Sequence, residues 1–215
     1  MLEILIKGGW WMIPLVLFSI ASLAVVLDRL MVFRNYARVD NRSLRARVME
    51  LLWSGRVDEA ALTCSQTPGP IAAVLLAGLQ AFDKHRAKSN PHSPITMTVK
   101  EAMDDYSIHA ISAVERRFAV LSTVGNAAPL LGMLGTVAGM IASFDALTTG
   151  GVSNEAVAGG ISVALITTAG GLVVALMAVI PYNYFTSKSD AIDLEIEEVK
   201  AQFVDVVAQA HESEA

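Results

Sequence analysis

Charged residues are scarce in this sequence, and cysteine is almost absent. Of its 215 residues, 17% are Asp, Glu, Lys or Arg and 53% are hydrophobic, a balance too apolar for an ordinary soluble domain of this size. The single cysteine, Cys64, excludes a disulfide framework or a cysteine metal site within one chain. The four histidines share no ligand spacing, so the sequence predicts no metal site and no cofactor.

The sequence also lacks the features of an enzyme or a nucleic-acid-binding protein. Its net charge of -5 disfavours nucleic acid as a partner, because such a partner requires a concentrated basic face. No nucleophile–base pair or phosphate-binding loop stands out, and the glycine pair Gly170-Gly171 lies inside an apolar run rather than after a strand. We therefore expect a protein that is not an enzyme.

Three long runs contain no charged residue, namely residues 8–27, 118–144 and 156–187. Each reaches the roughly 20 residues that a helix needs to cross a hydrocarbon core of about 30 Å. The first run has a second interpretation as a cleaved signal peptide, which we disfavour because the basic cluster follows the run instead of preceding it. The sequence thus predicts an all-α membrane protein with three transmembrane helices in a lipid bilayer.

Lys and Arg are unevenly distributed about these runs. Thirteen lie between Arg29 and Arg117, and none lies in residues 147–159, so the positive-inside rule puts the middle segment in the cytoplasm. The expected segments are an external N-terminus (1–9), a first span (10–30), a cytoplasmic helical segment (31–117), a second span (118–146), an external loop (147–159), a third span (160–186) and a cytoplasmic C-terminal helix and tail (187–215).

Apolar positions keep helical spacing from the cytoplasmic segment into the second span, with no Gly or Pro before Gly125. We therefore expect one continuous helix over residues 98–146 and a third span that continues into the tail. Both long helices would extend into the cytoplasm beside a small helical segment. Their apolar stripes belong either to a self-contained bundle or to contacts between neighbouring subunits, and we favour the second. In the tail the stripe comprises Ile192, Ile196, Val199, Phe203 and Val207.

The second span, "GNAAPLLGMLGTVAGMIASF" from residue 125, is rich in small residues. Gly135 and Gly139 have the GxxxG spacing that permits close approach of helices in lipid. Pro129, four residues after Gly125, predicts a kink. Residues three and four apart share a helix face. One predicted strip is Ala128, Gly132, Thr136, Gly139 and Ser143, and the third span has a matching strip of Ala164, Thr168, Gly171 and Ala175.

Thr136, Thr167 and Thr168 are the only hydroxyls expected near the middle of the membrane. They either line a crevice for water or a small cation, or bond the carbonyl one turn back. Proton relays in membranes use Asp, Glu or His, and residues 118–144 and 156–187 contain none. If the protein conducts protons, another chain has to supply the carboxylate.

The stretch "AAPLLGMLGTVAGMIASF", followed by "GGISVALITTAGGLVVALMAVIPYNYF", resembles the paired second and third spans of the ExbB/TolQ/MotA proton-channel family. The resemblance covers roughly residues 114–185 and is strongest to the ExbB and TolQ branches. It implies a subunit of the bacterial inner membrane with a periplasmic N-terminus and a cytoplasmic C-terminus. It places the family's pore threonines on Thr136 and Thr168.

The resemblance also implies partners. Five such subunits form a ring around two copies of a single-span, ExbD-like or TolR-like protein, whose membrane aspartate carries the proton. Proton flow then delivers work to a TonB-like or TolA-like protein. This sequence departs from the pattern at Val163, where the family often has glutamate, and at Met177, where a proline is usual.

Three functional hypotheses follow. The first is an ExbB-like subunit of a proton-driven motor that serves outer-membrane transport. The second is a TolQ-like subunit of the Tol-Pal envelope-integrity system. The third, from a different class, is a non-conducting membrane scaffold whose threonines bond only the backbone.

Overall fold

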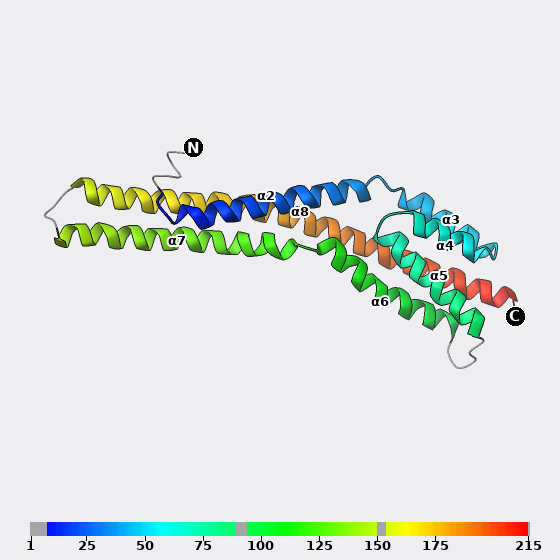
Figure 1. Cartoon of the computed structure of the whole chain (residues 1–215). Coiled ribbons are helices and arrows are strands. Elements are labelled where there is room, and N and C mark those ends of the chain that lie inside the picture. Colours follow the sequence, from blue (N-terminus) through cyan, green and yellow to red (C-terminus); the bar gives the residue numbers. More distant parts are fainter. Residues whose placement is uncertain (1–7, 89–93, 150–153, 215) are drawn as a thin grey trace. The chain divides into compact units, whose positions relative to one another are not determined.

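The computed structural model describes residues 8–88, 94–149 and 154–214, and within them it contains helices and no strand. The predicted all-α class is therefore confirmed for these residues. In chain order the helices are α2 (Met12–Tyr36), α3 (Asn41–Trp53), α4 (Val57–Gln66), α5 (Pro70–Lys88), α6 (Ile95–Glu115), α7 (Phe118–Thr149) and α8 (Asn154–Glu214) (Figure 1).

Three of these helices are long and apolar enough to cross a membrane, as predicted. The qualifying stretches are Met12–Tyr36, Phe118–Asp145 and Val157–Ala210. The chain divides into two compact units. We call Met1–Leu30 with Arg117–Phe185 the spanning unit, and Met31–Arg116 with Thr186–Ala215 the bundle unit.

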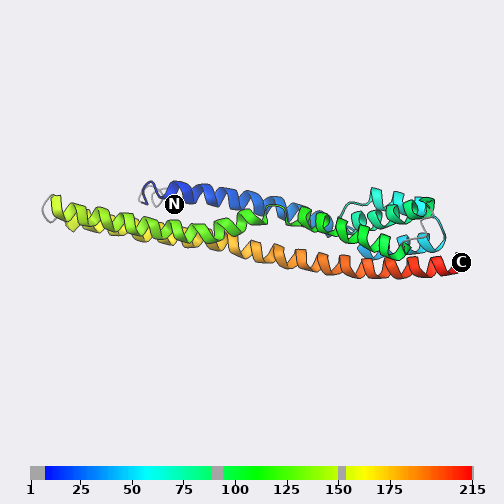
Figure 2. The same cartoon turned by 90° about the horizontal axis from the view of Figure 1, so that it is seen from below.

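In the spanning unit, α7 and the first part of α8 lie side by side in opposite directions, and α2 packs against both (Figures 1 and 2). The core between them is thin because most of its residues are small. It contains Met12, Leu15, Val124, Ala128, Val174, Ala175 and Ala178, with Phe18, Leu131 and Ile166 packed against it.

The bundle unit has a conventional apolar core, formed by α3, α4, α5 and α6 around the last part of α8. The stripe of α8 lies in this core, since Ile196, Phe203 and Val207 are fully buried within the chain. Met103 and Val99 of α6 are buried in the same cluster. Our favoured expectation, that these stripes pack between subunits, is therefore wrong. The periodicity of an apolar stripe predicts which face of a helix is buried. It does not predict whether the same chain or a neighbouring subunit covers that face.

The expected continuous helix from residue 98 to 146 is also wrong. Helix α6 ends at Glu115 and α7 begins at Phe118, with Arg117 at φ = 75° between them. A positive φ is costly for a residue with a side chain. Two contacts of the spanning unit hold it in place: Arg117 Nη1 lies 2.9 Å from Asp28 Oδ2, and the buried Phe118 ring stacks on Phe185. Neither contact is visible in the local sequence.

The turns of the bundle unit have ordinary local causes. Asp40 caps α3, where its carboxylate accepts from the backbone N–H groups of Arg42 and Ser43 at 3.1 and 3.3 Å. The chain turns at Ser54-Gly55, where Gly55 has φ = 71° after the end of α3.

We expect Phe203→Ala to destabilise the bundle unit strongly. The ring is fully buried, and removal of a buried phenyl group costs about 3–5 kcal/mol. Leu194→Ala is the matched control, because Leu194 lies on the same helix and is 72% exposed. Thermal unfolding of the detergent-solubilised protein should show a lower midpoint for Phe203→Ala alone. Equal midpoints for the two variants would contradict the assignment of the core.

The thiol of Cys64 should resist alkylation in the folded protein. Burial raises its pKa to about 11, so only about one thiol in a thousand is ionised at pH 8, compared with about a quarter for an exposed thiol. Maleimide labelling at pH 8 should be slow until the protein is unfolded in SDS. A Cys64→Ala/Ser65→Cys variant carries its thiol at the exposed neighbouring position and should react at once, so equal rates would overturn this prediction.

Candidate functional site

The backbones of α7 and α8 touch along a row of small residues, which we call the α7–α8 seam. A Cβ added to Gly139 would lie 2.7 Å from the carbonyl oxygen of Gly160, and one added to Gly171 would lie 2.6 Å from that of Ala128. These positions therefore admit only glycine at this helix separation. The seam consists of Ala128, Gly132, Gly135, Gly139 and Ser143 on α7, and Gly160, Ala164, Thr167 and Gly171 on α8.

Thr167 fills the middle of the seam. It is fully buried, and a Cβ at Gly135 would collide with its side chain. Its hydroxyl donates to backbone oxygens of its own helix, lying 2.9 Å from that of Ala164 and 3.0 Å from that of Val163. This is the backbone-bonded arrangement, in which the threonine serves packing.

The predicted strips are displaced by one residue at their centres. Gly135 occupies the seam where we expected Thr136, and Thr167 occupies it where we expected Thr168. Successive residues on a helix differ by about 100° in direction. Thr136 and Thr168 are consequently half-buried at the rim of the seam.

Both rim threonines adjoin the same turn of α7. The hydroxyl of Thr168 lies 3.2 Å from the carbonyl oxygen of Gly132 on the opposite helix, and equally far from that of Ala164 on its own. Thr136 is one turn after Gly132, and its hydroxyl donates to the carbonyl of Met133 at 2.6 Å. The two hydroxyls predicted as pore residues therefore lie next to the carbonyls of two consecutive residues of α7, Gly132 and Met133.

Helix α2 covers the other edge of this pair. The larger side chains that share a cluster with Met12 and Leu15 of α2 are Val124 and Leu131 on α7 and Ile166 and Val174 on α8. On each helix these positions are rotated from the seam in the direction opposite to the rim threonine. Thr136 and Thr168 thus share the edge of the α7–α8 pair that α2 leaves uncovered, which we call the threonine edge.

The structure also places the remaining predicted positions. Val163 lies on the α2 side of α8, since a Cβ on Gly9 would be 3.9 Å from its Cγ1; a side chain there is remote from the threonine edge. Gly125 is buried against Val179. Helix α7 continues through Pro129, and the kink at this residue stays a prediction.

The spanning unit contains a charged cluster that is not among the features predicted above. Asp28 accepts from Arg29 at 2.7 and 2.9 Å and pairs with Arg117 at 2.9 Å. Arg29 is 6% exposed, so its charge requires this partner. The available signal was that Asp28 and Arg117 each border an apolar run that the charge count put on the same side of the membrane.

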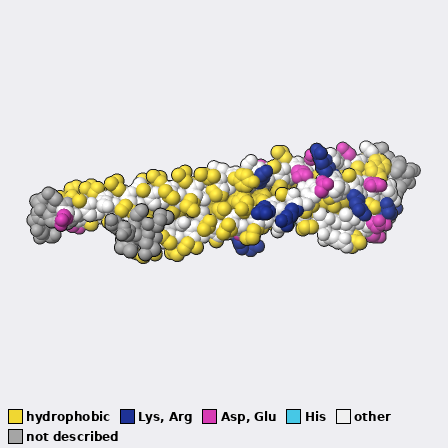
Figure 3. Space-filling view, turned by 90° about the horizontal axis from the view of Figure 1, so that it is seen from above, with side chains coloured by type: hydrophobic (Ala, Val, Ile, Leu, Met, Phe, Trp, Pro, Cys, Tyr) yellow, Lys and Arg dark blue, Asp and Glu magenta, His cyan; other side chains and the backbone are white. Residues whose placement is uncertain are grey.

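The lining of the threonine edge is otherwise apolar. Large hydrophobic side chains are exposed along both helices, among them Met133, Val137, Met140, Leu165 and Leu172. Figure 3 shows one face of the molecule, on which many hydrophobic side chains are exposed. Among the residues that the structure describes, no group of His, Cys, Asp or Glu is arranged to hold a metal ion. The edge therefore offers hydroxyls and apolar surface without a titrating group.

Comparison with known proteins finds a matching family model over residues 66–198, described as the MotA/TolQ/ExbB proton channel family. This range includes the seam and both rim threonines.

Individual relatives match over most of the chain. A protein of Methanothermobacter thermautotrophicus named as an ExbB homolog for biopolymer transport is 30% identical over 201 residues, 93% of this chain and 66% of that protein. The biopolymer transport protein ExbB-like 1 of a Synechocystis species is 31% identical, over 87% of this chain and 71% of its own length. The Tol-Pal system protein TolQ of Pseudomonas aeruginosa is 32% identical, over 86% and 83%.

Gly139→Leu should prevent correct folding of the α7–α8 pair, because its Cβ already collides with the backbone of Gly160. Gly159→Leu is the matched control, since a Cβ at Gly159 meets nothing within 4 Å. Size-exclusion chromatography in mild detergent should show aggregation or loss of the main species for Gly139→Leu only. A normal elution profile for that variant would refute the close packing of the seam.

Proposed function

This chain belongs to the MotA/TolQ/ExbB proton channel family, and on that basis we propose that it is a ring subunit of an ExbB-like, proton-driven motor. The family's members are non-enzymatic transport proteins, and this chain is a multi-pass membrane protein of that kind. The motor would couple proton flow across a bacterial inner membrane to mechanical work on a TonB-like protein.

The threonine edge is the observation that carries the proposal. Two hydroxyls that bond neighbouring carbonyls of α7 lie on the uncovered edge of the α7–α8 pair, within apolar surroundings. The apolar runs provide no acid of their own. A proton path along this edge therefore needs a carboxylate from a second protein, and we assign that role to the membrane aspartate of an ExbD-like or TolR-like single-span partner.

The hydrogen bonds of the rim threonines favour one protonation state of such a partner. A hydroxyl has one proton to donate and two lone pairs that accept. Thr136 gives its proton to Met133, and Thr168 gives its proton to Gly132 or Ala164. Both hydroxyl oxygens can therefore still accept a hydrogen bond from a partner's side chain but have no proton left to donate. This suits the O–H of a neutral carboxylic acid better than a carboxylate. The edge would thus hold the partner's aspartate after it has taken up a proton.

The energies are of a suitable size. One charge that moves through about 100 mV releases ~2.3 kcal/mol. A charged side chain at the bilayer centre costs roughly 2.5–3.5 kcal/mol on insertion scales. A single proton can therefore drive most of one exchange between a charged and a neutral aspartate, and the protein needs only to lower the remaining barrier with hydroxyls and water.

The exposed surface of the spanning unit supports the proposal of a ring. The spanning unit leaves large apolar side chains exposed on α7 and α8. In a ring, an exposed face of one subunit meets a different face of the next, and the contact closes on itself. We propose five copies around two copies of the partner, with the threonine edge toward the centre, the N-terminus in the periplasm and the bundle unit in the cytoplasm.

Two alternatives are each favoured by one observation. The 32% identity to the TolQ protein of Pseudomonas aeruginosa favours a TolQ-like subunit that acts on a TolA-like protein in envelope integrity. This alternative differs in the protein on which the motor acts, and the proton-driven mechanism is the same. The backbone hydrogen bonds of all three membrane threonines favour a scaffold that conducts nothing.

Replacement of either rim threonine by valine should abolish proton flux and leave assembly intact. Thr136→Val and Thr168→Val keep the side-chain shape and remove the acceptor that the partner's acid needs. The measurement is proton uptake into liposomes that contain this chain with its single-span partner, together with the size of the purified complex. We expect flux to fall at least tenfold without a change in size.

Thr123→Val is the control for this experiment, because Thr123 lies on α7 and is exposed away from the seam. It should retain the parental flux. Full flux in both rim variants would support the scaffold instead, as would undiminished flux from liposomes that contain this chain alone.

A further inference from the structure

The bundle unit contains a groove that the proposed proton path does not use. It runs between α6 and α8, has a volume of about 680 Å³ and lies wholly within this unit. Helix α6 contributes Ser107, Ile108, Ile111, Ser112 and Glu115, Arg116 directly follows α6, and α8 contributes Asp193 and Glu197. We call it the α6–α8 groove.

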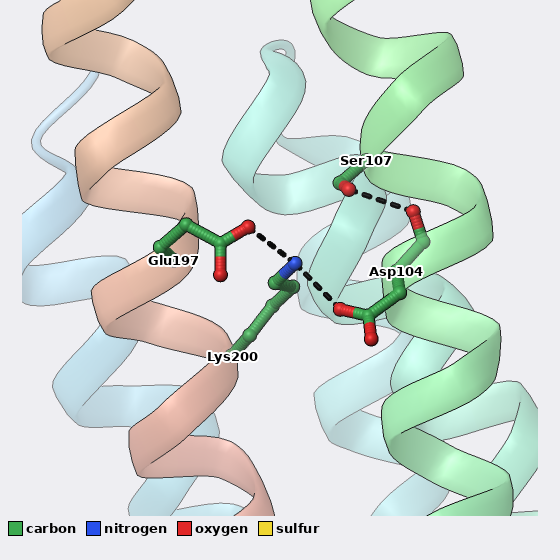
Figure 4. A network of polar contacts seen from close by, with 4 residues as sticks. All are labelled: Asp104, Ser107, Glu197 and Lys200. Carbon is green, nitrogen blue, oxygen red and sulfur yellow. Dashed lines mark hydrogen bonds and ion pairs between the residues drawn. The ribbon is translucent and has the colours of Figure 1, made fainter.

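Polar contacts across the two helices fix the width of this groove. Near one end, the Lys200 ammonium of α8 binds Asp104 of α6 at 2.6 Å and Glu197 at 2.5 Å (Figure 4). The Lys200 side chain is only 7% exposed, so removal of its partners would leave a buried charge. Farther along, the hydroxyl of Ser189 donates to Glu115 at 3.1 Å. These contacts between α6 and α8 therefore stabilise the shape of the groove.

The lining of the groove combines negative charge with an aliphatic surface. It contains three carboxylates and one guanidinium, and all four of these residues are exposed. The buried Lys200 pairs with Glu197 of this lining, so Glu115 and Asp193 are the carboxylates of the groove that Lys200 does not bind. Ile111 is half-buried beneath them, and Ile108 is 68% exposed. An occupant that matches this lining carries positive charge and at least one aliphatic side chain.

Other classes of ligand fit less well. The carboxylates are not grouped to hold a metal ion among the residues that the structure describes. Nucleic acid and other polyanions are repelled by an excess of acidic groups. A lipid headgroup requires a basic or neutral lining. A basic polypeptide segment satisfies both the charge and the apolar surface.

We propose that the α6–α8 groove binds a short basic segment of a partner protein, adjacent to that partner's membrane span. The identity of the partner rests on the function proposed above. A single-span protein whose working domain is periplasmic has a cytoplasmic end, and the positive-inside rule makes the flank of its span rich in Lys and Arg. A groove of opposite charge in the cytoplasmic bundle unit is suited to hold that flank.

The probe is a fluorescein-labelled decapeptide with four lysines and two leucines, titrated into the purified full chain in uncharged detergent and read by fluorescence anisotropy. In Glu115→Gln/Asp193→Asn the groove loses two carboxylates, and neither is a partner of Lys200. Each exposed ion pair is worth up to about fivefold in affinity. We expect binding to weaken by roughly 5- to 30-fold in this variant, and to weaken in the parent as salt is raised.

Glu50→Gln/Asp83→Asn is the matched control. It removes the same two carboxylate types from exposed positions on α3 and α5, so the change in net charge is identical. It should bind within twofold of the parent. Equal weakening of both variants would mean a diffuse attraction to an acidic protein and would overturn the proposal, as would a parent that does not bind.

Two further readouts separate the alternatives. Replacement of both peptide leucines by serine should weaken binding to the parent, because the aliphatic lining then has no partner; unchanged affinity would reject the groove as the site. A change of oligomeric size in Glu115→Gln/Asp193→Asn with unchanged peptide affinity would identify a second copy of this chain as the occupant, against the proposal. The titration needs no proton gradient, so it can fail while the rim threonines still prove essential for flux.

Discussion

The contact between the backbones of α7 and α8 is the constraint on which the spanning unit depends. At Gly139 and Gly171 the opposite carbonyl oxygen lies where a Cβ would stand, so the helices are as close as their main chains allow. In lipid there is little hydrophobic gain from pairing two apolar helices, and association relies on such close packing. The separation and register of the pair follow from these glycines, and the positions of all other side chains follow from the register.

This register gives adjacent threonines different roles. Thr167 points into the seam and fills the space that Gly135 leaves, whereas Thr168 stands at the rim and reaches the carbonyl of Gly132. Both hydroxyls are satisfied by backbone, as a buried hydroxyl in an apolar medium must be. What distinguishes them is access. A side chain of another protein can approach the threonine edge, which α2 leaves uncovered, but it cannot enter the seam.

The two units are stabilised in different ways. The bundle unit buries large side chains such as Leu75, Met103 and Phe203 and gains from their removal from water. The spanning unit has few large buried residues and many exposed ones, which is tolerable only where lipid or another subunit replaces water. This division suits the ring subunit proposed above, because the bundle keeps its structure while the apolar faces of the spanning helices remain available for assembly.

The sequence by itself determined the helical class, the three helices that are apolar enough to span a membrane, and the absence of an acid from residues 118–144 and 156–187. These properties depend on composition and on residues a few positions apart, so periodicity and charge counting suffice. The tertiary structure decided which threonine enters the seam, because neighbouring positions differ by about 100° on the helix and only contact with α8 selects one. It also decided the break at Arg117, held by Asp28 and the stacked Phe118, and the burial of the α8 stripe within its own chain. The α6–α8 groove likewise joins residues more than seventy positions apart. Such contacts are settled only when all the helices pack together, and no local pattern records them.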